Sequence, residues 1–153
     1  MAHVLIVDDD ALVAEYASDS LINAGHGTGW VNSGKKAMNL LRRRKPDVVL
    51  LDQDMPDMSG SDVLRKLRNS ADFYDLPIVM LTAVTGKHDE DQAFFAGATD
   101  YIRKPFKPEE LVYRIEKIIK KRGKKRENNG LQRLIKESQG QYLPPDELQS
   151  RLV

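Results

Sequence analysis

The 153-residue chain contains no cysteine. This absence excludes a thiol nucleophile, a cysteine-ligated zinc site and a disulfide framework. The chain also has no apolar run near the roughly 18 residues that a membrane-spanning helix needs. Its first ten residues carry three aspartates (MAHVLIVDDD), where a signal peptide would carry Lys or Arg. The sequence therefore predicts a cytoplasmic protein that does not enter a membrane.

The net charge of +1 hides an uneven distribution. Residues 1–107 carry 13 basic and 16 acidic side chains, whereas residues 108–153 carry 11 basic and 7 acidic ones. The composition, 41% hydrophobic and 31% charged, is typical of a folded globular protein. The sequence thus predicts an acidic body followed by a basic tail.

Short apolar runs alternate with helical patterns along the chain. The predicted strands are His3–Val7, Thr28–Asn32, Asp47–Leu51, Ile78–Leu81 and Tyr101–Ile102. The predicted helices are Ala11–Ala24, a helix from the N-cap Ser33 to Arg44, Ser61–Asn69, Asp89–Ala96, and a helix that begins at Pro108. Apolar strands that alternate with helices are typical of a parallel sheet covered on both faces. We expect an α/β fold, a doubly wound five-stranded parallel sheet, with a C-terminal helical extension.

The first and last predicted helices each carry an apolar stripe that we expect to be buried. The stripe of the first helix consists of Leu12, Tyr16, Ala17, Leu21 and Ala24. The stripe of the last helix consists of Leu111, Val112, Ile115, Ile118 and Ile119.

Polar side chains gather where the predicted strands end. Asp8 and Asp9 follow the first strand, Asp52 the third, Thr82 the fourth and Lys104 the fifth. Right-handed crossovers bring these ends to one edge of a parallel sheet, where such folds bind ligands. Three carboxylates would repel one another without a cation, and oxygen ligands favour Mg²⁺. A lysine and a hydroxyl beside this metal suit a transferring phosphoryl group, which a carboxylate can accept as an aspartyl phosphate.

The order of these motifs resembles the receiver domain of bacterial two-component response regulators over about residues 1–122. The motifs are VLIVDDD, VVLLDQDMPDMSG, IVMLTA, FFAGATDYI and KPF. The separations are 43 residues from Asp9 to Asp52, 30 from Asp52 to Thr82 and 22 from Thr82 to Lys104. The resemblance implies a flavodoxin-like receiver fold and a phosphoprotein of phosphorelay signal transduction. It implies a regulatory phosphoacceptor rather than an enzyme with its own turnover.

The resemblance also implies a role for each matching residue. Asp52 would accept a phosphoryl group from a phosphohistidine on a sensor histidine kinase or phosphotransfer protein. Mg²⁺ would be held directly by Asp9 and Asp52, by the backbone carbonyl of Asp54, and through water by Asp8. Thr82 and Lys104 would bind phosphate oxygens, and Lys104-Pro105 would be a cis peptide bond. Tyr101 would turn inward when Thr82 moves, as a bistable element biased by a local charge.

Two residues depart from the family pattern. Asp54 places an additional acid two residues after Asp52, and we hypothesise that its charge slows phosphorylation by small anionic donors. Phe95 stands where relatives generally carry a polar residue, which suggests part of a partner surface on the face of the fourth helix, and the alternative is a side chain that tucks under a neighbour. Asp10 is expected to act only as the N-cap of the first helix.

Two other functions are open alternatives. A phosphatase of the haloacid dehalogenase type would use Asp52 and Asp54 as an Asp-x-Asp pair, but such an enzyme needs a cap domain and the chain leaves no room for one. A flavin or nucleotide binder of similar topology would need a glycine-rich phosphate loop after the first strand, where this chain has three aspartates. The histidines His3, His26 and His88 show no ligand spacing.

The tail gives the last set of expectations. We assign residues 1–122 to the receiver and residues 123–153 to a basic linker and helical tail. The basic run from Lys117 to Arg126 has two interpretations, a solvated helix end that leads into a linker and a site that binds phosphates or lipid. The pattern favours the first. Residues 123–153 number 31, fewer than the roughly 50 of an independent domain. No sequence-specific DNA binding is therefore expected from this chain. Two alternatives stay open for the tail: the truncated lead-in to an output domain, or a helical extension for homodimerisation.

Overall fold

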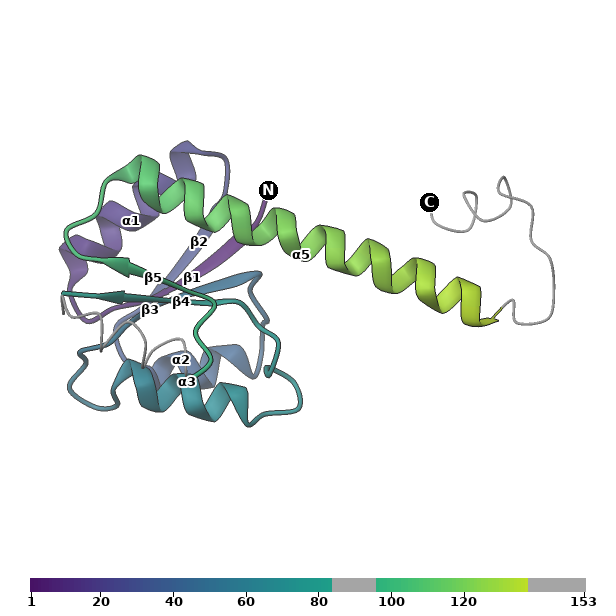
Figure 1. Cartoon of the computed structure of the whole chain (residues 1–153). Coiled ribbons are helices and arrows are strands. Elements are labelled where there is room, and N and C mark those ends of the chain that lie inside the picture. The colour runs from purple at the N-terminus through teal and green to yellow at the C-terminus, as the bar shows by residue number, and fades with distance from the viewer. Residues whose placement is uncertain (84–95, 138–153) are drawn as a thin grey trace. The chain divides into compact units, whose positions relative to one another are not determined.

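The computed structural model describes residues 1–83 and 96–137, with the backbone alone at 125–129 and 131–137. Its strands are β1 (His3–Val7), β2 (Gly27–Val31), β3 (Val48–Asp52), β4 (Ile78–Thr82) and β5 (Asp100–Arg103). All four neighbouring pairs are parallel, and the strand order is β2-β1-β3-β4-β5 (Figure 1). The doubly wound parallel sheet that the sequence predicts is therefore confirmed, with each strand within two residues of its predicted bounds.

The described helices are α1 (Ala11–Asn23), α2 (Gly34–Leu41), α3 (Gly60–Arg68) and α5 (Pro108–Glu137). Figure 1 shows α2 and α3 on one face of the sheet, with α1 and the start of α5 on the other. Side chains of β1, β3 and β4 pack with Ala37, Leu41, Val63 and Leu67 to form a continuous core. The predicted helix Asp89–Ala96 lies outside the described residues up to position 95, and so do His88 and Phe95.

Local capping confirms two predicted helix starts. The Asp10 carboxylate accepts the backbone N–H groups of Leu12 and Val13, at 3.0 and 3.4 Å, and so caps α1. The Ser33 hydroxyl accepts the N–H of Lys36 at 3.1 Å and caps α2. These short polar side chains satisfy donors that the first turn of a helix leaves without partners.

The predicted apolar stripe of α1 is partly wrong. The helix buries Ala14, Ala17 and Leu21, whereas Leu12 is 78% exposed and Tyr16 is 45% exposed. The two small alanines allow the helix to approach the sheet along their own side, and this turns Leu12 and Tyr16 to the flank. Tyr16 packs there on the ring of Phe106, with the ring centroids 5.4 Å apart. Ala24 is exposed as well.

The last helix begins at Pro108, as the sequence predicts, and continues through the basic run to Glu137. In its expected stripe, Leu111 and Ile115 are buried, whereas Val112, Ile118 and Ile119 are only partly buried. The chain divides into two compact units, Met1–Glu116 and Lys117–Val153. The assignment of the receiver to residues 1–122 and of the tail to 123–153 stays a prediction. Among the described helices, none has the length and apolar character needed to span a bilayer.

Candidate functional site

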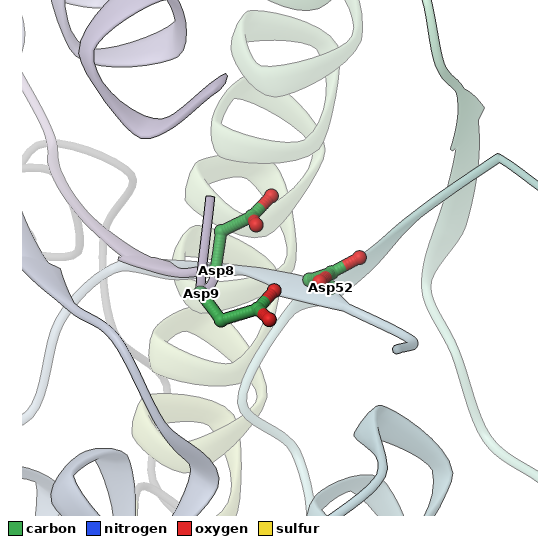
Figure 2. A group of neighbouring side chains, drawn as sticks. All are labelled: Asp8, Asp9 and Asp52. Atoms are coloured by element: carbon green, nitrogen blue, oxygen red, sulfur yellow. The ribbon is translucent and has the colours of Figure 1, made fainter. Parts of the chain in front are cut away.

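Two neighbouring strands bring the acidic residues together. Val7 of β1 lies opposite Leu51 of β3, so the next residues, Asp8 and Asp52, lie side by side where the pairing of these two strands ends. Carboxylate oxygens of Asp8, Asp9 and Asp52 lie within 4.8 Å of one another. Figure 2 shows these three side chains grouped at the ends of their strands. The predicted acidic cluster is confirmed, and its cause is the parallel register of the two central strands.

Burial makes this cluster electrostatically unfavourable by itself. Asp8 is fully buried and Asp52 is only 3% exposed, whereas Asp9 is exposed. Burial, and next the charge of Asp8, raise the pKa of Asp52 from 3.8 to about 6, although Lys104 partly opposes this shift. A carboxylate kept from water favours its neutral form unless a cation compensates its charge. The site therefore favours the binding of positive charge.

Lys104 supplies part of that charge. Its Nζ lies 2.9 Å from Asp8 Oδ2 and 3.1 Å from Asp52 Oδ1. Burial lowers the pKa of Lys104, but its contacts with Asp8 and Asp52 outweigh burial, so the pKa is raised overall. The Lys104 N–H donates to the Thr82 carbonyl at 2.7 Å, which ties the end of β5 to the end of β4. Lys104 therefore stays protonated at neutral pH and faces both buried acids.

One oxygen of Asp8 tests whether these residues suit a metal. Oδ1 accepts the N–H of Asp10 at 2.9 Å, but Oδ2 is buried and has no hydrogen-bond partner among the described residues. Lys104 lies close to Oδ2 as an ion pair without the alignment of a hydrogen bond. A buried carboxylate oxygen held by an ion pair alone is costly, and a hydrated divalent ion would supply a hydrogen-bond donor through one of its waters. The three-carboxylate donor set therefore fits Mg²⁺.

The structure places the other predicted residues as follows. Thr82 is buried at the end of β4, one residue beyond the pair that joins Asp52 and Leu81. Tyr101 is 5% exposed and already packs in the core beneath the site. The Asp54 side chain is exposed. The Lys104-Pro105 bond is cis, as expected.

The loop after Asp52 is held by contacts that the sequence does not reveal. A Cβ at Gly60 would clash with the Asp52 carbonyl oxygen, so only glycine lets α3 begin this close to the acceptor strand. The Gly60 N–H donates to the Gln53 carbonyl at 2.9 Å, and Ser61 Oγ donates to Gln53 Oε1 at 2.8 Å. The Asp57 carboxylate accepts N–H groups at the start of α2. The loop after Asp52 is therefore held by two helix N-termini, that of α3 through the Gln53 carbonyl and that of α2 through the Asp57 carboxylate.

Fold and site together define a parallel α/β domain with an acidic, lysine-bearing pocket at the carboxyl edge of its sheet. The family model described as "Response regulator receiver domain" matches residues 4–116, and the chain belongs to this family. Receiver domains of response regulators are regulatory phosphoacceptors rather than enzymes. The family shown by these comparisons is the one that the sequence motifs resemble.

Three known proteins illustrate the similarity. The DNA-binding response regulator MtrA of Mycolicibacterium paratuberculosis is 43% identical over 118 residues, which cover 77% of this chain and 51% of MtrA. The response regulator SaeR of Staphylococcus epidermidis is 35% identical over 134 residues, which cover 88% of this chain and 57% of SaeR. The structure of the Vibrio cholerae chemotaxis protein CheY4 matches with a TM-score of 0.73 and 30% identity, and covers 77% of this chain and 98% of CheY4. The chain thus spans about half the length of the curated relatives it matches.

Proposed function

We propose that this chain is a phosphorylation-activated switch that accepts a phosphoryl group on Asp52. The observation that carries the proposal is the contact of Lys104 Nζ with Asp52 Oδ1 beside the buried Asp8. This arrangement places one carboxylate oxygen of Asp52 next to a fixed positive charge that can bind phosphoryl oxygens. The pKa of about 6 keeps Asp52 mostly ionised at neutral pH, as a nucleophile must be.

The proposed transfer forms one bond to phosphorus and breaks one. An oxygen of the Asp52 carboxylate attacks phosphorus, the phosphorus–nitrogen bond of a phosphohistidine breaks, and the imidazole of the donor leaves with the electron pair. Lys104 neutralises charge on the phosphoryl oxygens throughout. Mg²⁺, held by Asp9, Asp52 and the Asp54 carbonyl, with Asp8 reached through water, would supply further positive charge when bound. Hydrolysis of the acyl phosphate would later restore the free carboxylate.

The signal is proposed to leave the site through Thr82 and Tyr101. Thr82 is buried at the end of β4, and its hydroxyl would move toward the new phosphoryl group. Tyr101 is already buried in the core, so phosphorylation would hold the ring in this position rather than bring it inward. A local charge change would in this way bias a packed, two-state element.

A sensor histidine kinase or a phosphotransfer protein is the proposed donor. Beside Lys104 lies an apolar hollow of about 450 Å³, lined by Leu12, Val13, Tyr16, Ala83, Pro105 and Phe106. A donor must bring its phosphohistidine to Asp52 in the acidic site. The apolar hollow lies next to that site, because Lys104 lines both. The exposed Leu12 would then be covered by the donor. A cytoplasmic location and the partners downstream stay predictions.

Transfer of radiolabel from acetyl phosphate tests the proposal. With Mg²⁺, the wild type should incorporate close to one phosphoryl group per chain and lose it slowly. The variant Asp52→Ala, and the wild type in EDTA, should incorporate none. The haloacid dehalogenase alternative predicts continuous release of phosphate from a phosphomonoester, so a steady-state phosphatase assay separates the two functions. A wild type that incorporates no radiolabel in the presence of Mg²⁺ would refute the proposed switch.

A further inference from the structure

The only tryptophan of the chain contacts the backbone of the acidic site. Trp30 lies on the edge strand β2, and its indole Nε1 donates a hydrogen bond to the carbonyl oxygen of Asp8 at 2.8 Å. The ring is still 47% exposed, so burial of the indole does not by itself explain the position. The hydrogen bond reaches from β2 to the end of the neighbouring strand β1, to the peptide that joins Asp8 to Asp9.

This side chain replaces a backbone donor. The Asp8 N–H donates to the Val31 carbonyl at 3.2 Å, which continues the parallel pairing of β1 with β2 by one residue. β2 ends at Val31, and Ser33 is already the N-cap of α2, so the strand has turned away from β1 at this point. The indole N–H supplies the bond to the Asp8 carbonyl that a longer strand would supply from its backbone.

The orientation of the Asp8 carbonyl determines where Asp9 lies. A peptide unit is planar, so a hydrogen bond that fixes the Asp8 carbonyl also fixes the nitrogen and Cα of Asp9. Within the described part of the chain, no hydrogen bond or ion pair holds the exposed Asp9 carboxylate, although it lies within 4.8 Å of the other two acids. Its position therefore depends on its backbone, which Trp30 holds at the Asp8 carbonyl and which the bond from the Asp10 N–H to Asp8 Oδ1 holds on the other side.

We propose that Trp30 is a positioning residue for the divalent cation, acting through the Asp8–Asp9 peptide. It touches neither the ion nor the phosphoryl group, and it presents the Asp9 carboxylate in the geometry that a small, strict octahedral ion requires. The inference rests on the proposed metal site. It adds a residue from a strand that none of the matching motifs contains.

Titration with Mg²⁺ by isothermal calorimetry tests the inference without any phosphorylation step. Trp30→Phe keeps an aromatic ring but removes the N–H donor. The account predicts a Mg²⁺ dissociation constant roughly tenfold higher than in the wild type, the size expected when a residue that orients a ligand is lost. Tyr74→Phe is the matched control, because Tyr74 is also an exposed aromatic residue. It precedes β4 and so lies at the amino ends of the strands, away from the acidic site. This control should bind Mg²⁺ as the wild type does.

The outcomes separate the two proposals. A wild type that binds no Mg²⁺ would refute the metal site of the proposed function. A wild type that binds Mg²⁺ and a folded Trp30→Phe variant with the same dissociation constant would overturn the role of Trp30 alone. If Trp30→Phe does not fold, the single indole N–H resonance of the wild type decides the question. It should shift as Mg²⁺ is added and stay unchanged in Asp9→Asn, and an indole resonance insensitive to Mg²⁺ in the wild type would also overturn the role.

Discussion

The two edges of the sheet each contain a charge kept partly or fully from water, Arg68 at the amino edge and Asp8 at the carboxyl edge, but the two charges are satisfied very differently. At the amino edge, the guanidinium of Arg68 donates to three backbone carbonyls, those of Gly97, Phe73 and Leu76, at 2.7 to 3.3 Å. A longer contact of 3.5 Å reaches Thr99 Oγ1. At the carboxyl edge, Asp8 keeps a buried oxygen without a hydrogen bond, beside Lys104.

The difference shows what each charge does. Arg68, the last residue of α3, donates to the turn before β4 and to the residues before β5, so it joins segments that are distant in sequence. Its four recorded contacts all lie within the fold. The carboxyl edge has the opposite character, because its acids need a cation that Lys104 supplies only in part. A charge whose contacts all lie within the fold is structural, whereas a buried charge that is only partly compensated marks a site that binds.

Replacing Arg68 should have the largest effect on stability. Arg68→Met removes the side-chain donor from three backbone carbonyls and so unties α3 from the turns before β4 and β5, and we expect the free energy of unfolding to fall by about 2–4 kcal/mol. Added Mg²⁺ should stabilise this variant as much as it stabilises the wild type. Urea denaturation with and without Mg²⁺ measures both quantities. Arg65→Met, an exposed arginine of the same helix, should change stability little. A Mg²⁺ response lost in Arg68→Met would contradict the separation of the two edges.

Replacing Lys104 should have a smaller effect that metal offsets. Lys104→Met leaves Asp8 and Asp52 without their cation, and we expect a loss of about 1–3 kcal/mol in EDTA, because Asp52 can protonate in part. Saturating Mg²⁺ should recover most of this loss, so the stabilisation by metal should exceed that of the wild type. Phosphorylation should nevertheless fail. The exposed Lys107→Met serves as the control. An equal loss with and without Mg²⁺ would contradict the account.

The raised pKa of Asp52 gives a prediction for pH. A folded-state pKa of about 6 against 3.8 means that the folded protein holds the proton at pH values where the unfolded chain has lost it. The free energy of unfolding in EDTA should therefore fall by about 1–2 kcal/mol from Asp52 as pH rises from about 5 to 8. Asp52→Asn should remove this component. Mg²⁺ binding should weaken as pH falls below 6, because the proton competes with the ion. Identical pH profiles of stability in the wild type and in Asp52→Asn would contradict the assignment of this pH dependence to Asp52.

The exposed Asp54 should have the smallest effect. If its charge repels small anionic donors, Asp54→Asn should raise the rate of phosphorylation by acetyl phosphate about two- to threefold, and less at high salt. Asp72→Asn removes an equally exposed acid that lies before β4, and should not change the rate. An unchanged rate in Asp54→Asn would dismiss the hypothesis.

The comparison also explains what the sequence could predict. The strands and the carboxyl edge are predictable because β-branched runs define parallel strands, and parallel strands bring their following residues to one edge. The caps at Asp10 and Ser33 are predictable because they involve donors only two or three residues away. Local and topological rules thus cover most of the candidate site.

The remaining contacts depend on distances that no local pattern contains. The backbone acceptors of Arg68 lie between 5 and 29 residues away. The bond from Trp30 to Asp8 spans 22 residues and requires the register of β1 with β2. The apolar content of α1 likewise predicts burial but not its limit, because the sheet covers only the side that carries Ala14 and Ala17.

The most direct test of the central claim is the mass of the intact chain after incubation with acetyl phosphate and Mg²⁺. The account predicts a gain of one phosphoryl group in the wild type, mapped to Asp52 by reductive trapping of the acyl phosphate. It predicts no gain in Asp52→Asn or in EDTA. A wild type of unchanged mass, or a phosphoryl group that remains in Asp52→Asn, would contradict the claim that this acidic edge exists to accept phosphate.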